Sequence, residues 1–262
     1  MKSKTIDIYC FSGTGNTYLV TKMIVDNLKK NNYIVNLFSI EKAKVDDINL
    51  NHNIGLAIPI AYFSTYPFIW DFIERLPKTN GTSFFLITSY AGTAGALALQ
   101  IKKAIVKKGY QPIGAVNVKM PNNFTQSQVN EKKVNTLMSK ANIKTIHFVE
   151  ELIQEKSVWK YNVITSYLFL FLLYTIGDYP VKLYRKLYPI TVNDTKCTQC
   201  GICYQVCPAD TIRMYEFPRF ENNCQYCLRC FAHCPEQAIY FQDKVFVPYR
   251  SADIKSINQN DN

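Results

Sequence analysis

The chain has 262 residues, of which 48% are hydrophobic and 19% are charged, so it has room for one medium domain and a small one in an ordinary folded protein. The net charge of +10 lies almost entirely in residues 1–150, which carry +9, whereas residues 197–262 carry −1. This basic N-terminal part could attract an acidic partner protein or a membrane surface. Because no basic run is interleaved with aromatic residues, we expect no nucleic-acid binding.

The N-terminal residues favour a strand followed by a helix. In MKSKTIDIYCF, Asp7 interrupts the apolar run too early for a signal peptide, so residues 5–11 read as a strand. Apolar residues at helical spacing predict a helix over 16–29, and FSGTGNT lies between the two elements. A small polar loop at a helix N-terminus is an anion site, with backbone N–H groups and the hydroxyls of Ser12, Thr14 and Thr17 as donors.

The FSGTGNT loop differs from two common nucleotide loops. No lysine follows Gly15, as a Walker loop requires, and Tyr18 stands where the dinucleotide fingerprint needs a third glycine. The pattern S/T-x-T-G-x-T suits one terminal phosphate and resembles the FMN phosphate loop of flavodoxins. This resemblance implies that FMN contacts Ser12, Gly13, Thr14, Gly15, Asn16 and Thr17.

Alternating strand and helix patterns continue downstream. They predict strands over 33–38, 54–60, 83–88 and 113–120, and helices over 67–76 and 96–108. Alternation of this kind gives an α/β, doubly wound parallel sheet, with the flavodoxin order 2-1-3-4-5 and the ligand at the carboxyl ends of the strands.

Two further loops leave those carboxyl ends, over 59–67 and 89–95. In flavodoxins the corresponding loops clasp the flavin ring, with an aromatic side chain stacked on it. The resemblance implies that Tyr62 and Tyr90 take this place, and that Gly92 lets the backbone approach the flavin edge.

A connector follows the sheet. Residues 126–156 predict one long amphipathic helix, and residues 161–177 carry no charge. That stretch is short for a membrane crossing, which needs about 20 residues. We expect a buried or surface-docking helix, with membrane-surface contact less favoured. The predicted units are residues 1–156, the connector 157–189 and a C-terminal domain over 190–250.

Eight of the nine cysteines lie between Cys197 and Cys234, in CTQCGICYQVCP and CQYCLRCFAHCP. Each half spells C-x2-C-x2-C-x3-C-P, the bacterial pattern for a pair of 4Fe–4S clusters, in which the fourth cysteine ligates the other cluster. This predicts one cluster held by Cys197, Cys200, Cys203 and Cys234, and a second held by Cys224, Cys227, Cys230 and Cys207.

Zinc and disulfides are the alternatives to iron–sulfur clusters. Structural zinc uses two pairs of ligands, so the third cysteine of each triplet would have no role in a zinc site. Disulfides need an oxidising compartment. Clusters with free thiolates imply a reducing cytoplasm. Residues 190–245 resemble the two-cluster bacterial ferredoxins, which implies a small α+β domain.

Taken together, FSGTGNT, the third-strand loop, SYAGTAG, MPNNF at 120–124 and the cysteine octet resemble the flavodoxin–ferredoxin fusion proteins of anaerobes. The resemblance implies an electron carrier that relays electrons between FMN and two 4Fe–4S clusters and serves redox partner proteins. Two other hypotheses remain open. One is a flavin-dependent reductase of a small substrate that its own clusters feed, and the other is a redox-sensing regulator.

Overall fold

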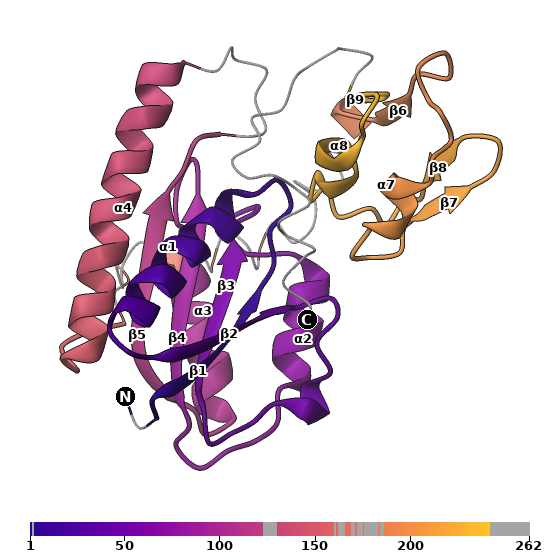
Figure 1. The fold of residues 1–262 in the computed structure, drawn as a ribbon. Helices are drawn as coiled ribbons and strands as arrows, with labels where there is room; N and C mark the ends of the chain where they lie inside the picture. Colours follow the sequence, from indigo (N-terminus) through magenta and orange to yellow (C-terminus); the bar gives the residue numbers. More distant parts are fainter. Residues whose placement is uncertain are drawn as a thin grey trace.

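The computed structural model describes residues 1, 3–122, 130–159, 161 and 188–241, together with isolated positions between 166 and 187. It contains a large N-terminal domain built on one parallel sheet and a small C-terminal domain (Figure 1). The small domain lies beyond the carboxyl ends of the strands. This is the edge of an open α/β sheet at which ligands bind.

The large domain is organised around a five-stranded sheet in the order β2-β1-β3-β4-β5, with every neighbouring pair parallel. Its inner strands are buried along nearly their whole length, as expected where helices cover both faces. The order confirms the flavodoxin-like topology predicted from the sequence. The strands are β1 (Thr5–Cys10), β2 (Ile34–Ser39), β3 (Asn53–Pro59), β4 (Ser83–Tyr90) and β5 (Gln111–Lys119).

In the described part of the chain, four α-helices cover the sheet. Helices α1 (Asn16–Lys30) and α4 (Glu131–Ile153) pack on one face, whereas α2 (Pro67–Arg75) and α3 (Leu97–Lys107) pack on the other. A 3-10 turn at Val45–Asp47 follows β2. Local chemistry explains the helix starts: α2 has proline in its first turn, and the side chain of Asn130 caps α4 by accepting a hydrogen bond from the backbone of Lys133.

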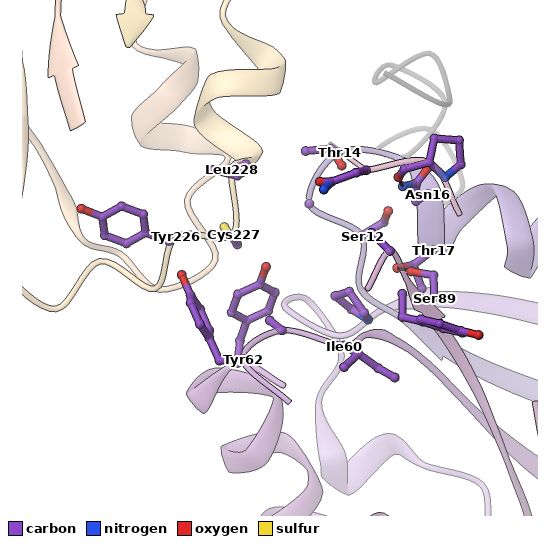
Figure 2. Close-up of a pocket in the computed structure, with 18 residues that line it drawn as sticks. Ser12, Thr14, Asn16, Thr17, Ile60, Tyr62, Ser89, Tyr226, Cys227 and Leu228 are labelled. Atoms are coloured by element: carbon purple, nitrogen blue, oxygen red, sulfur yellow. Dashed lines mark hydrogen bonds between the residues drawn. The ribbon is translucent and has the colours of Figure 1, made fainter. Parts of the chain in front are cut away.

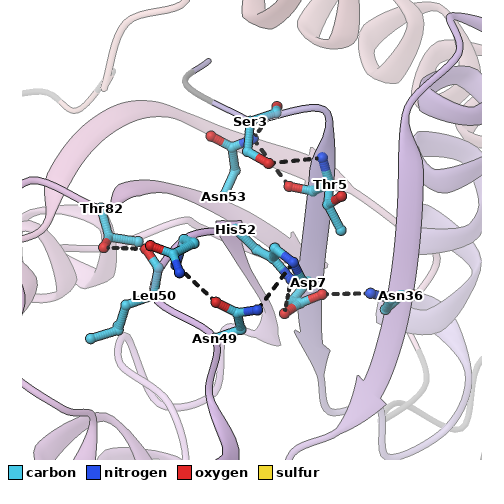
Figure 3. A network of polar contacts seen from close by, with 10 residues as sticks. Ser3, Thr5, Asp7, Asn36, Asn49, Leu50, His52, Asn53 and Thr82 are labelled. Carbon is cyan, nitrogen blue, oxygen red and sulfur yellow. Dashed lines mark hydrogen bonds and ion pairs between the residues drawn. The ribbon is translucent and has the colours of Figure 1, made fainter.

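A polar network ties the strands together toward their amino ends (Figure 3). Asp7 is buried in β1, and its carboxylate accepts a hydrogen bond of 2.7 Å from Asn36 and pairs with His52 at 2.8 Å. The side chain of Asn53 donates to the carbonyl of Ser3 at 2.6 Å. These bonds satisfy a buried carboxylate and fix the strand register. The loops at the carboxyl ends of the strands are therefore held by a rigid sheet.

The small domain consists of short elements around the cysteines, which confirms the predicted α+β class. Two antiparallel pairs join β6 (Ile190–Val192) to β9 (Ile239–Phe241) and β7 (Ile212–Met214) to β8 (Pro218–Phe220). Helices α7 (Ile202–Gln205) and α8 (Arg229–His233) each carry the third cysteine of a triplet. The domain has a core of its own, made of Cys203, Ile212, Tyr226, Leu228, Cys230, Phe231 and Ile239.

Most of the predicted connector over 157–189, including most of its uncharged stretch 161–177, and all residues after 241 lie outside the described residues. Where the chain is described, it has no helix that combines the length and the apolar character of a membrane span.

Candidate functional site

The FSGTGNT loop leaves β1 and turns directly into α1. Gly15 adopts a left-handed conformation with φ of 104°, and its N–H donates to the hydroxyl of Ser12 at 3.1 Å. Within the described residues no side chain caps α1, and its first turn carries no acidic group. The positive end of the helix dipole at this loop therefore favours an anion.

Hydrogen bonds tie this loop to its neighbours. The hydroxyl of Thr17 lies 2.8 Å from that of Ser89, at the end of β4. The side-chain amide of Asn16 donates to the carbonyl of Pro121, beyond β5, at 2.8 Å. Loops that follow three strands are thus held in one arrangement, which preorganises the donors.

The loop after β3 makes a tight turn that presents Tyr62. Ala61 and Ser64 exchange both backbone hydrogen bonds at 2.9 Å, while Tyr62 and Phe63 have φ values of 52° and 63°. Two bulky residues in the left-handed region store strain, which is characteristic of ligand-binding loops. Gly95, with φ of 57°, allows the loop after β4 to pack here, because a Cβ at this position would lie 2.8 Å from the carbonyl oxygen of Phe63.

These loops enclose a cavity of about 270 Å³ (Figure 2), near the lower end of the size range of ligand pockets. Figure 2 places the hydroxyl residues Ser12, Thr14, Thr17 and Ser89 at the phosphate-loop end, and Tyr62 and Tyr226 at the other. The lining comprises Ser12, Gly13, Thr14, Asn16, Thr17, Pro59, Ile60, Ala61, Tyr62, Tyr66, Ser89, Tyr90, Ala91, Pro121, Asn122, Tyr226, Cys227 and Leu228.

The structure brings together seven of the nine predicted flavin contacts: Ser12, Gly13, Thr14, Asn16, Thr17, Tyr62 and Tyr90. Gly15 forms the turn at the start of α1 and does not line the cavity. Gly92 is also outside the lining, and a Cβ built on it would meet no atom within 4 Å.

Sequence reasoning missed several residues of the lining. Tyr66 is buried, and its ring packs edge-on against Phe11 at 5.8 Å. Residues 226–228 come from the small domain, more than 130 positions further along the chain than Tyr90. No local pattern reports a contact at such separation, since it depends on how two folded domains dock.

The eight clustered cysteines line two cavities in the small domain, four to each. The sets are the predicted crossed ones, since each triplet shares its cavity with the fourth cysteine of the other half. One cavity is lined by Cys197, Cys200, Cys203 and Cys234. The other is lined by Cys207, Cys224, Cys227 and Cys230.

The backbone around the two sets repeats with a period of 27 residues. Left-handed residues recur as the pairs Gln199 and Tyr226, Gly201 and Leu228, and Asp210 and Gln237. Hydrogen bonds to sulfur repeat as well: Thr211 N–H donates to the Sγ of Cys207 at 3.4 Å, and Ala238 N–H to the Sγ of Cys234 at 3.2 Å. Such bonds stabilise thiolates and tune iron–sulfur clusters.

Burial and the proximity of other thiols suppress ionisation of the most buried of these cysteines, Cys203, Cys227 and Cys230. Burial, reinforced by the nearby Cys234, Cys197 and Cys200, raises the pKa of Cys203 to about 11. Burial also raises the pKa of Cys227 to about 12, with Cys224 and Cys207 adding to it. Without metal, Cys203 and Cys227 therefore hold their protons at neutral pH, and a metal that binds them must release those protons. Among the residues described, no three His, Cys, Asp or Glu side chains converge closely enough to hold a single metal ion.

Cys227 lines both the phosphate-loop cavity and one of the four-cysteine cavities. It also packs against the core of the large domain, while Tyr62 packs against the core of the small one. The two candidate sites therefore share a wall.

Comparisons with known proteins agree with this organisation. Residues 196–239 match the family described as the 4Fe-4S dicluster domain, and this confirms the predicted iron–sulfur segment. No curated protein matches the chain in sequence.

Among solved structures, the flavodoxin of Streptococcus pneumonia TIGR4 is 18% identical, with a TM-score of 0.46, and the match covers 58% of this chain and 99% of that one. Flavodoxin 2 from Bacillus cereus is 16% identical, with the same TM-score and coverage. The two-electron reduced flavodoxin of Megasphaera elsdenii is 24% identical, with a TM-score of 0.41 and coverage of 53% and 98%. Since these scores are below 0.5, the fold assignment rests on the strand order.

Proposed function

We propose that the protein is an electron carrier that binds FMN in the phosphate-loop cavity and two 4Fe–4S clusters in the four-cysteine cavities. The observation that carries this proposal is Cys227, which belongs to the lining of both kinds of cavity. A flavin exchanges one or two electrons and a cluster exchanges one, so a chain holding both can connect two-electron and one-electron partners.

The chemistry of the first cavity fits FMN. A terminal phosphate would meet the first turn of α1 and the hydroxyls of Ser12, Thr14 and Thr17, all of which are buried. The ring system would lie toward Tyr62 and Tyr226, where the lining is aromatic. The chain's own part is to orient the flavin and to exclude water from it.

The donor set of the small domain fits two cubane clusters. Each cavity offers four thiols, and each fourth cysteine already accepts a backbone hydrogen bond at sulfur. The match of residues 196–239 to the 4Fe-4S dicluster family supports the same assignment. The crossed sets would hold the two clusters within one small core.

Anaerobic purification followed by quantification of iron, sulfide and flavin tests this proposal. Two 4Fe–4S clusters and one phosphate loop give eight irons, eight sulfides and one FMN per chain. Zinc in place of iron after reconstitution, or FAD in place of FMN, would contradict the assignment.

A second candidate, a flavin-dependent reductase, is favoured by a larger cavity of about 750 Å³ between β5 and α4. It shares Tyr90, Ala91, Pro121 and Asn122 with the phosphate-loop cavity, and Lys119, Lys133, Lys140 and Lys144 line it. The positive charge of these lysines suits an organic anion as the substrate. If 4-nitrobenzoate reoxidises the reduced protein with saturation kinetics, and Lys133→Gln with Lys140→Gln weakens that saturation, the protein is an enzyme. A linear dependence on 4-nitrobenzoate concentration supports the carrier.

A further inference from the structure

The loop over residues 224–229 of the small domain lies directly against the phosphate loop. Figure 2 shows Cys227 and Leu228 facing the segment that carries Ser12 and Thr14. The approach is close, because a Cβ added to Gly13 would lie 2.1 Å from the carbonyl oxygen of Cys227. Only glycine permits two backbones to meet in this way.

Side chains fasten this loop to the large domain. Arg229 forms an ion pair with Glu41, which follows β2, and only 5% of the arginine side chain and 15% of the glutamate side chain are exposed. The guanidinium also lies 5.3 Å above the ring of Phe11, immediately before the phosphate loop. Gln225 also contacts the large domain, because its side-chain oxygen accepts a hydrogen bond of 3.3 Å from the N–H of Phe68.

A buried ion pair is better suited to orientation than to net stability. Desolvation offsets much of its attraction, whereas loss of one partner leaves an uncompensated buried charge. The Arg229–Glu41 pair therefore fixes one relative position of the two domains and penalises others.

The equivalent loop of the other cysteine set lacks these features. Cysteines and left-handed backbone positions coincide at a spacing of 27 residues, but the residues that face the large domain differ. Gln199, Gly201 and Ile202 stand where this loop has Tyr226, Leu228 and Arg229.

Leu228 is the most telling of these differences. It has φ of 63° where Gly201 has 73°, so a leucine occupies a conformation that favours glycine. Its side chain is 6% exposed and lines the phosphate-loop cavity. The strained backbone at Leu228 has no counterpart in the repeat loop, where Gly201 adopts the same conformation without strain. Such a local difference indicates a function of the loop that carries Leu228.

We propose that loop 224–229 forms one wall of the FMN site, and that the Glu41–Arg229 ion pair positions this loop. FMN is then held jointly by the two domains, and its affinity depends on residues outside the flavodoxin-like fold. This inference rests on the proposed FMN binding and adds the residues that complete the site.

The test measures the FMN dissociation constant of flavin-stripped, cluster-loaded full-length protein by quenching of FMN fluorescence. Glu41→Gln removes the anion and should raise the constant at least about tenfold, because the unpaired arginine disfavours the docked position. Leu228→Gly installs the residue of the repeat loop and should raise it about fivefold through lost apolar contact. In Glu41→Gln, which changes only the large domain, the iron content and the cluster EPR signals should equal those of the wild type. Leu228 also lines the cavity of Cys207, so for Leu228→Gly the iron content alone is compared.

Glu221→Gln is the matched control. It removes a carboxylate of the same small domain from an ion pair with Arg213, at 3.1 Å, in which both side chains are about 40% exposed. It should leave the FMN dissociation constant unchanged, because exposed pairs contribute little. A double variant, Glu41→Met with Arg229→Met, removes both charges and should bind FMN more tightly than Glu41→Gln if the pair acts by positioning.

The outcomes separate this inference from the proposed function. Wild-type protein that binds no FMN would refute the proposed function itself. Wild-type protein that binds FMN, with Glu41→Gln and Leu228→Gly both within about twofold of its affinity, would overturn the joint site alone, since a twofold change is below the contribution of one contact.

Discussion

At the scale of single residues, Gly13 and Gly92 form a natural pair for testing the contact between the domains. A methyl group at Gly13 would collide with the backbone of Cys227, whereas one at Gly92 would meet open space. Neither glycine is among the residues with positive φ, so the substitutions differ mainly in what the methyl group meets.

We therefore predict that Gly13→Ala lowers FMN affinity about tenfold and the melting temperature by several degrees, as overpacking does. Gly92→Ala should match the wild type in both respects. FMN titration and calorimetry measure the two effects. Equal behaviour of the two variants would mean that the domains do not meet at Gly13.

Cys10 is the cysteine outside the cluster sets. Burial raises its pKa to about 11, and the hydroxyl of Thr21, 3.6 Å from its sulfur, opposes part of that shift. Only about 0.1% of Cys10 would be thiolate at pH 8, and the thiolate is the reactive form, so alkylation should be slow.

Iodoacetamide should therefore leave Cys10 unlabelled in the native protein at pH 8. Its labelling rate should rise about tenfold for each pH unit up to its pKa, because the thiolate fraction does. Peptide mass spectrometry reads the label, and denatured protein provides the fully reactive control. Native labelling at pH 8 as fast as in denaturant would show that Cys10 is accessible and ionised.

Cys207 tests the crossed ligand sets. It shares a cavity with Cys224, Cys227 and Cys230 rather than with the triplet beside it in sequence. Cys207→Ala should thus damage the cluster of that second triplet and leave the other intact. EPR spectroscopy of the reduced variant distinguishes the two clusters. Loss of the signal from the Cys197 triplet, with the other retained, would reverse the assignment.

At the scale of elements, the strand–loop–helix unit of β1 and α1 carries the expected phosphate contacts. Thr14 and Thr17 are 6% and 2% exposed, so their hydroxyls are positioned rather than solvated. The double variant Thr14→Ala with Thr17→Ala should weaken FMN binding at least about a hundredfold, since hydrogen bonds to a charged group contribute about 1.5–3 kcal/mol each.

The same double variant should keep both clusters, because its changes lie in the large domain. Iron quantification and FMN titration test the two halves of this prediction. Thr136→Ala is a matched control on α4, where the exposed hydroxyl contacts only the backbone of its own helix in the described structure. Full FMN retention in the double variant would show that the phosphate binds elsewhere.

The elements were largely predictable from local pattern. The first strand and helix were expected over 5–11 and 16–29 and lie at Thr5–Cys10 and Asn16–Lys30. The helix expected over 126–156 is described over Glu131–Ile153, and Asn130 caps its N-terminal end. Periodicity and turn residues act within a few positions, so they determine such elements well.

The candidate site was predictable only within each domain. The phosphate loop and the cysteine sets follow from spacing, but Tyr66, Leu228 and the Glu41–Arg229 pair do not. Docking depends on the shapes of two finished domains. One signal was available in the sequence: aligning the two cysteine halves reveals leucine and arginine where the first half has Gly201 and Ile202.

At the scale of the whole molecule, the small domain lies over the carboxyl edge of the sheet and contributes to the cavity there (Figure 1). The docked arrangement brings a cysteine set and the phosphate loop to one shared wall at Cys227. Fusion in one chain keeps the two sites at high effective concentration, and the buried ion pair orients them. We therefore predict electron transfer within single molecules.

Rapid mixing of the fully reduced, FMN- and cluster-loaded protein with a one-electron oxidant selective for the clusters tests this claim most directly. Flavin absorbance should report reoxidation after the clusters are oxidised, at a rate that does not change over a wide range of protein concentration. Transfer through a shared wall is unimolecular, which requires that independence. A rate proportional to protein concentration would mean that electrons pass between molecules, and it would contradict the relay.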